Sequence, residues 1–193
     1  MPGTLQVGGN TVITHTGDAG AGTNTINNAV VFPAGHVIKT SEYNIDRATY
    51  TTTYFPVDDT IPQITEGVEI FSQSYTPSST ATNILIRVNN LFLIETSNVA
   101  DAAYGALFIS GDTDAKVVFL ATYAGGNVNY HHGQLSGEVL VPSWSGAKTI
   151  SVRKGSPHHA VQYFLGGGGS SGPTTVYGLN TCPSATVVVQ EIS

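Results

Sequence analysis

The sequence predicts an all-β fold, an antiparallel β-sandwich that is jelly-roll-like and carries an extended N-terminal arm. Beyond residue 35, short runs that alternate apolar and polar residues follow one another, separated by turn-forming residues. No stretch of about a dozen residues keeps helical spacing free of Gly, Pro or Thr, and residues 99–103 are the best candidate for a helical turn. The first thirty or so residues are rich in Gly, Thr and Asn and hold too few apolar residues to form a core.

The composition and the hydrophobic pattern change near Phe32, which divides the chain into an arm (residues 1–35) and a head (residues 36–193). The head is long enough to bury a core of its own. Within the arm, residues 5–14 (LQVGGNTVIT) indicate a short strand, a Gly-Gly-Asn turn and a second strand. Such a unit cannot bury itself alone, so we expect it to anchor the protein, wound with identical copies or laid on another protein. Its apolar anchoring positions are Leu5, Val7, Val12 and Ile13.

Strand signals recur at regular spacing through the head. They fall at residues 36–43, 49–55, 67–75, 83–96, 103–110, 116–123, 134–141, 148–153, 159–165, 174–178 and 186–192. In the central segment Ile84, Ile86 and Val88 share one face. Residues 139–141 are all apolar, which predicts that this run is covered on both sides.

The connections between these strands carry turn residues, and no helix intervenes. Strands that follow one another without helices indicate a sandwich or barrel, and an eight-stranded jelly roll is the best single topology. Residues 166–173 (GGGGSSGP) are too long and flexible for a hairpin turn and predict an exposed loop.

Composition excludes several classes of protein. Charged residues make up only 10% of the chain, against roughly 25% in ordinary globular proteins, so the surface is rich in hydroxyls and amides. The net charge of −6 argues against a nucleic-acid partner. The single cysteine, Cys182, cannot form an internal disulfide.

No apolar run approaches the ~18–20 residues of a membrane helix, so we expect no membrane insertion. The N-terminus lacks signal-peptide features, so we expect synthesis in a host cytoplasm and release within a particle.

Two groups of segments resemble bacteriophage virion proteins. Residues 5–14, with Gly17 and Asp18 following, resemble the stalk and anchor regions of phage tail fibres. Three further segments look like the head domain of phage tail fibres and related virion proteins: residues 32–39 (FPAGHVIK), 75–88 (YTPSSTATNILIRV) and 185–192 (ATVVVQEI). The chain departs from that pattern at Asn83, where the family usually has Lys, and residues 99–180 match nothing in it. The resemblance implies a homotrimeric β-sandwich head in a virion, with other virion proteins as partners.

Candidate chemistry is sparse, and the sequence predicts no catalytic residue, no metal site and no cofactor. The vicinal pairs His131-His132 and His158-His159 lie near turns, where exposed polar loop residues are common. Neighbours on a strand point to opposite faces, so a metal or pH-sensitive site would need one His from each pair or copies around an axis. The carboxylates of residues 58–59 and 112–114 sit where Asp commonly caps turns.

Aromatic residues are the remaining pointers to a binding surface. Trp144 lies at a turn, and Tyr123 and Tyr130 flank a Gly/Asn-rich segment that ends in a His pair. Loop aromatics beside Asn and His suit stacking on sugar rings or packing against a partner, whereas a Trp at a strand end is more often a lid on the core. The predicted contacts to a host-surface glycan or protein are Trp144, Tyr123, Tyr130, His131 and His132.

The sequence therefore indicates a non-enzymatic virion structural protein. The stalk-like arm favours a tail-fibre or tail-tip adhesion protein. The shortness of the chain favours the alternative, a capsid decoration protein that clamps capsid subunits. A carbohydrate-binding β-sandwich module and a polysaccharide lyase or hydrolase on the same fold are further alternatives.

Overall fold

The computed structural model divides the chain into two compact units, Met1–His36 with Ser193 and Val37–Ile192, here called the arm and the head. It describes residues 3–7, 10–17, 23–26, 34–45, 50–51, 55–56, 58, 60–80, 82–96, 102–122, 131–155, 161–165 and 185–193.

The arm is a small antiparallel sheet of three strands, β1 (Gly3–Val7), β2 (Asn10–Thr16) and β3 (Thr23–Ile26), in that order. The predicted hairpin is confirmed, with Leu5 directly opposite Ile13, whereas β3 was not predicted. None of the arm residues whose burial the structure describes is buried, and Leu5 is 56% exposed. Among the side chains of this sheet whose burial is described, the apolar ones therefore form no core.

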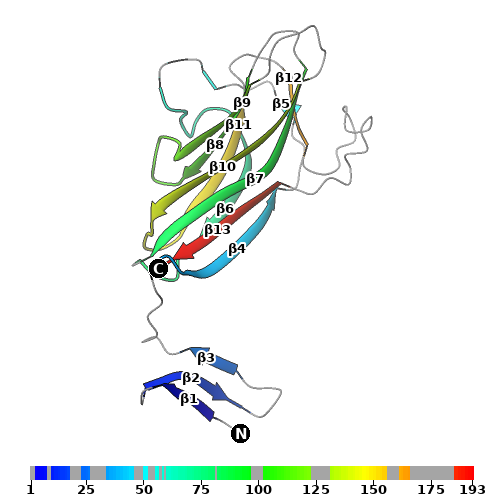
Figure 1. Ribbon diagram of the computed structural model, residues 1–193. Helices are drawn as coiled ribbons and strands as arrows, with labels where there is room; N and C mark the ends of the chain where they lie inside the picture. Colours follow the sequence, from blue (N-terminus) through cyan, green and yellow to red (C-terminus); the bar gives the residue numbers. More distant parts are fainter. Residues whose placement is uncertain are drawn as a thin grey trace. The chain divides into compact units, whose positions relative to one another are not determined.

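The head is a jelly roll of two antiparallel sheets (Figure 1). The first has the order β4 (Val37–Ile45), β13 (Ala185–Ile192), β7 (Asn83–Thr96), with β10 (His131–Pro142) on the other side of β7. The second has the order β6 (Val68–Tyr75), β11 (Lys148–Gly155), β8 (Ala102–Ile109), β9 (Val117–Thr122). Strands from distant parts of the chain interleave as the jelly roll requires, so the predicted fold class is confirmed.

Two short strands extend the first sheet beside the second half of β7: β12 (Val161–Leu165) and β5 (Tyr50–Thr51). The predicted strand at residues 174–178 lies outside the described residues. The predicted helical turn at residues 99–103 is wrong for Ala102 and Ala103, which begin β8 and pair with β9. Their pairing in the sheet outweighs the weak local preference of alanine for helix.

The main core lies between the two sheets and draws on both. Ile84, Ile86 and Val88 of β7 are fully buried, as their alternation predicts. The prediction that residues 139–141 are covered on both sides is wrong. Val139 and Val141 pack against the core, but Leu140 is 58% exposed and pairs with Leu85 on the outer face of the first sheet.

A smaller cluster covers the opposite face of the second sheet. Phe55, Ala106 and Phe108 are buried there, and Ile64, Tyr104 and Ala115 pack against them. The segment around Phe55 therefore shields this face of the second sheet from water, which explains why β8 is apolar on both sides.

The ring of Phe119 lies between two glycines. A Cβ on Gly105 would stand 2.0 Å from the ring, and one on Gly137 would stand 2.5 Å from it. Gly105 belongs to β8, and Gly137 follows a register shift in β10. Since β9 and β10 neighbour each other in the sandwich, the Phe119 ring fills the space between the sheets along this border, and only glycine leaves room for it.

Candidate interaction sites

The head has two distinct ends. At one, which we call the entry end, the chain enters β4 at Val37, and this residue pairs with Ile192 near the C-terminus. At the other, which we call the far end, β7 finishes at Thr96 and β10 starts at His131. The second sheet follows the same polarity, because Ala102 pairs with Thr122 at the far end.

The structure separates the predicted contact residues. Trp144 lies just beyond β10 at the entry end, and His131 and His132 begin the same strand at the far end, opposite Glu95 and Ile94. Twelve strand residues separate these ends by roughly 35–40 Å. Tyr123, Tyr130, His158 and His159 lie outside the described residues, although Thr122 and His131, which bracket the two tyrosines, are both at the far end.

Trp144 packs against the main core, so the lid that the sequence allowed is confirmed. It also lines a hollow of about 180 Å³ at the entry end, which we call the Trp144 hollow. Its other polar lining comes from the turn after β8, the residue that follows β10 and the start of β11: Asp112, Lys116, Ser143 and Lys148.

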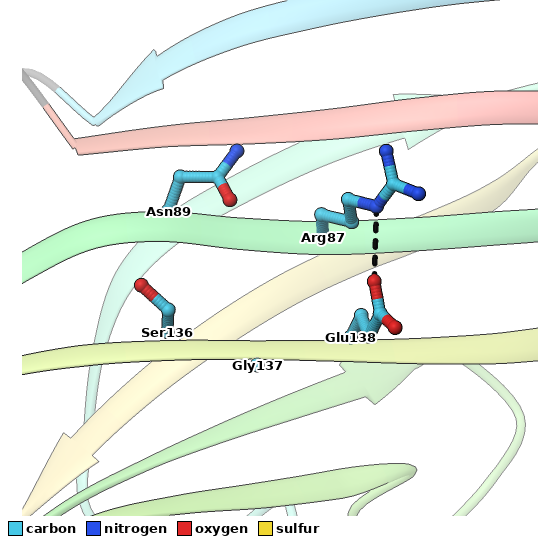
Figure 2. Close-up of a pocket in the computed structure, with 5 residues that line it drawn as sticks. All are labelled: Arg87, Asn89, Ser136, Gly137 and Glu138. Carbon is cyan, nitrogen blue, oxygen red and sulfur yellow. Dashed lines mark hydrogen bonds and ion pairs between the residues drawn. The ribbon is translucent and has the colours of Figure 1, made fainter.

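A second hollow, of about 230 Å³, lies on the outer face of the first sheet. Figure 2 shows Arg87 and Asn89 on β7 facing Ser136 and Glu138 on β10. Arg87 Nε donates to Glu138 Oε2 at 3.0 Å, and Arg87 Nη1 donates to Gln190 Oε1 at 3.2 Å. Both members of the ion pair are substantially exposed, so it contributes little to stability. The site is shallow and polar, and its charges cancel.

A third hollow, of about 200 Å³, lies over the smaller cluster and is lined by Phe55, Tyr104 and Asp58 among others. Asp58 Oδ1 accepts from the amide and the hydroxyl of Thr60, at 3.1 and 2.5 Å. This carboxylate caps a turn, as its sequence context predicts.

A buried carboxylate organises the entry end. Glu191 on β13 is fully buried and accepts hydrogen bonds from the Tyr75 hydroxyl at 2.7 Å and from the Ser78 amide at 3.0 Å. The Ser78 hydroxyl also donates to it, and Lys39 Nζ lies 3.3 Å away. We call Glu191, Tyr75, Ser78 and Lys39 the Glu191 network. Residues 32–39, 75–88 and 185–192 each supply at least one member of this network.

The network shifts the ionisation of its members. Burial alone would raise the pKa of Glu191, but hydrogen bonds from Ser78 and Tyr75 and the nearby Lys39 ammonium together hold the pKa below its usual value. Burial raises the pKa of Tyr75, and the hydrogen bond to the Glu191 carboxylate raises it further. Glu191 is therefore an ionised acceptor, and Tyr75 a neutral donor, at neutral pH.

Glu191 and Lys154 are the two charged residues that are fully buried in the described structure, and neither is among the site residues predicted from the sequence. The signal was present in the alternation of their strands. Val187, Val189 and Glu191 share one face of β13, and Ile150, Val152 and Lys154 share one face of β11. A charged residue that continues an inward-facing apolar series is expected to be buried. Because a buried charge is costly, it needs a partner or an altered pKa.

Within the part of the chain that the structure describes, no group of three or more His, Cys, Asp or Glu side chains converges. Nor does that part contain a helix long and apolar enough to span a membrane.

Comparisons with known proteins add only distant likenesses. No protein family matches the sequence, and no curated protein matches it. Among solved structures, the chain is similar to the EclA C-terminal domain, a sugar-binding protein, with 12% identity over 75% of this chain and 83% of that one and a TM-score of 0.31. It is also similar to a chain of infectious bursal disease virus, Gx strain, with 10% identity over 92% of this chain and 40% of that one and a TM-score of 0.34.

Proposed function

We propose that this protein is a non-enzymatic structural component of a tailed-phage virion, anchored by its arm, homotrimeric, and serving as a tail-fibre or tail-tip adhesion protein. It is made in the host cytoplasm and carried in the virion. The arm contacts other virion proteins, and the far end of the head contacts a glycan or protein of the host surface.

The observation that carries the proposal is the unburied arm sheet. Two or three short strands are not stable in water without a surface to pack on. Leu5, which lies opposite Ile13, is 56% exposed, and none of the arm residues whose burial the structure describes is buried. A second protein surface, from sibling copies or from another virion component, would complete this sheet.

The entry end of the head is built to withstand a pull from the arm. Force on the arm reaches the head at Val37, the first residue of β4. The Lys39 ammonium on that strand lies beside Glu191, and Glu191 is bound to Tyr75 of the opposite sheet. The network therefore links the strand that takes the load to both sheets.

The far end of the head is the proposed contact surface for the host. It lies opposite the point at which the chain enters, so an anchored head leaves it free. The strand ends at Thr96, Thr122, His131 and Val161 gather there, as the pairing of β7 with β10 and β12 requires. The His131-His132 pair begins β10 at this end, whereas Trp144 lies at the entry end.

The test compares full-length protein with a variant that lacks residues 1–30, in phage assembled with either. The truncated protein should stay folded and trimeric by circular dichroism and light scattering, and should be missing from purified particles. Leu5→Asp in the full chain should weaken incorporation. Thr4→Asp, on the opposite face of the same strand, is the matched control. Loss of head folding on truncation, or unchanged incorporation of both variants, would contradict the proposal.

Imaging of assembled particles with gold-labelled protein separates the two virion placements. Label at the tail tip or on fibres supports the adhesion protein. Label at threefold positions of the capsid would instead support the alternative, a decoration protein whose arm clamps capsid subunits. Release of reducing ends from host polysaccharide would instead indicate an enzyme.

A further inference from the structure

We propose that the Trp144 hollow binds a carboxylated sugar residue, as one ring of an acidic polysaccharide. The hollow is at the entry end of the head, away from the proposed receptor contact at the far end. The inference therefore goes beyond the proposed function and can fail separately from it.

The Trp144 ring is held in a fixed orientation. Its Nε1 donates to the backbone carbonyl of Tyr75 at 3.4 Å, and its ring meets that of Tyr75 edge-on with centroids 6.2 Å apart. Tyr75 is in turn fixed by Glu191. The indole is partly buried and lines the hollow. A preorganised indole face is the surface on which the C–H groups of a pyranose stack, at little cost in side-chain entropy.

Lys148 supplies a cation for an anionic group. Its Nζ lies 6.0 Å from the centre of the Trp144 ring and 3.9 Å from where a Cβ on Gly111 would stand, so the ammonium reaches across the hollow toward the turn after β8. Lys148 forms no ion pair with any residue that the structure describes. Lys116, the other lysine of this hollow, is already paired with Asp112 at 3.2 Å.

The charge of the hollow selects for an anion. Two lysines and one aspartate line it, which leaves one net positive charge in a chain whose net charge is −6. Of the three hollows described above, the one on the outer face balances Arg87 against Glu138, and the one over the smaller cluster carries only Asp58. Among them, only the Trp144 hollow combines a tryptophan ring with an excess of positive charge.

Asp112 favours an acidic sugar over an acidic peptide. Its carboxylate can only accept hydrogen bonds, so a ligand there must bring donors. A uronic acid offers hydroxyl donors to Asp112 and a carboxylate to Lys148 from a single ring. The side chain of a Glu or Asp offers only acceptors, so an acidic peptide would also have to bring a backbone N–H into the same hollow. The volume of about 180 Å³ is below that of sites for drug-sized ligands and suits a single ring.

Intrinsic fluorescence provides a direct test, because Trp144 is the only tryptophan in the chain. Oligogalacturonate added to the full-length protein should shift the emission of Trp144 saturably, with at least tenfold tighter binding than the matched neutral galactose oligomer. Lys148→Met should weaken binding of oligogalacturonate about tenfold or more, since a charged hydrogen bond is lost. Lys148→Arg should retain most of the binding, and Arg87→Met, on the outer face, should leave it unchanged.

Four results would overturn the inference. These are the absence of any saturable change in fluorescence, equal affinity for the neutral oligomer, full binding by the Lys148→Met variant, and equal affinity for a short Asp/Glu peptide. The last would assign the hollow to an acidic peptide segment instead. Circular dichroism of each variant establishes that its head is folded, and Lys148→Arg keeps the comparison informative if Lys148→Met is unstable.

Discussion

The hydroxyl of Tyr75 donates a hydrogen bond of 2.7 Å to Glu191, a residue 116 positions further along the chain. Tyr75 ends β6 in one sheet, and Glu191 lies in β13 of the other, so the bond joins the two layers of the sandwich. Removing one partner of a buried charged hydrogen bond costs more than the bond itself contributes, because the other group stays buried without its partner.

Glu191→Gln should therefore lower the free energy of unfolding by about 2–3 kcal/mol, since the amide loses the charge and presents a donor to other donors. Tyr75→Phe should cost about 1–2 kcal/mol, because Ser78 and Lys39 still satisfy the carboxylate. Urea denaturation measures both changes. Arg87→Met, which breaks an exposed ion pair, is the control and should change the value by less than about 1 kcal/mol. A Glu191→Gln variant as stable as wild type would show that the Glu191 network does not stabilise the fold.

Acid should weaken the head through Glu191. The pKa of this carboxyl is lower in the folded protein than its usual 4.5, so its ionised form stabilises the fold above that pH. As the pH falls below about 4.5, the unfolded chain takes up the proton first, and the contribution is lost on approach to the folded pKa. The stability gap between wild type and Glu191→Gln should therefore narrow between pH 5 and pH 3 in urea titrations. A gap that stays constant over this range would show that folding leaves the pKa of Glu191 at its usual value.

Much of the fold could be predicted because strand alternation is a local property of the sequence. The alternation of Ile84, Ile86 and Val88 along the strand predicts which face of the strand is buried, and no information on neighbouring strands is needed. The same alternation predicts that the side chains of Glu191 and Lys154 point inward. The groups that contact them cannot be predicted, because they come from strands more than a hundred residues apart or from pairings that the sequence leaves open. Leu140 shows the converse. Its exposure follows from its place opposite Leu85 on an outer face, and an unbroken apolar run cannot reveal that.

The candidate sites were harder to predict for the same reason. The His131-His132 pair begins β10, and Trp144 lies just beyond its other end. Aromatic and histidine residues that the sequence groups as one contact surface therefore lie at opposite ends of the head. The Trp144 hollow needs Asp112 and Lys148 from other turns, and only the jelly-roll connectivity brings these turns together.

Gly105→Ala and Gly137→Ala should each destabilise the head by about 2–4 kcal/mol, because a Cβ at either position collides with the Phe119 ring. Thermal or urea unfolding measures the loss. The double variant Gly105→Ala/Phe119→Leu is the control, since the smaller side chain gives the new methyl group room. It should be more stable than the sum of the two single changes predicts. Strictly additive losses would mean that the glycines are needed for another reason.

Lys154 should make the head more stable as the pH rises from neutral into the alkaline range. Burial lowers the pKa of its ammonium from 10.5 to about 7. Between these two values the unfolded chain binds more protons than the folded one, so the free energy of unfolding increases with pH. Below about pH 7 both states are protonated, and the cost of the buried charge stays constant. Lys154→Met removes the titrating group and keeps most of the volume of the side chain.

The measurement for Lys154 is the difference in unfolding free energy between Lys154→Met and wild type, taken in urea from pH 7 to pH 9.5. This range stays below the pH at which an unfolded tyrosine ionises, so the raised pKa of Tyr75 does not interfere. The advantage of Lys154→Met should be largest near pH 7 and should shrink by a few kcal/mol toward pH 9.5. Lys148→Met, which removes a lysine at the opposite end of β11, serves as the matched control and should show no such trend. A difference between Lys154→Met and wild type that does not change with pH would show that Lys154 keeps its ordinary pKa and reaches water.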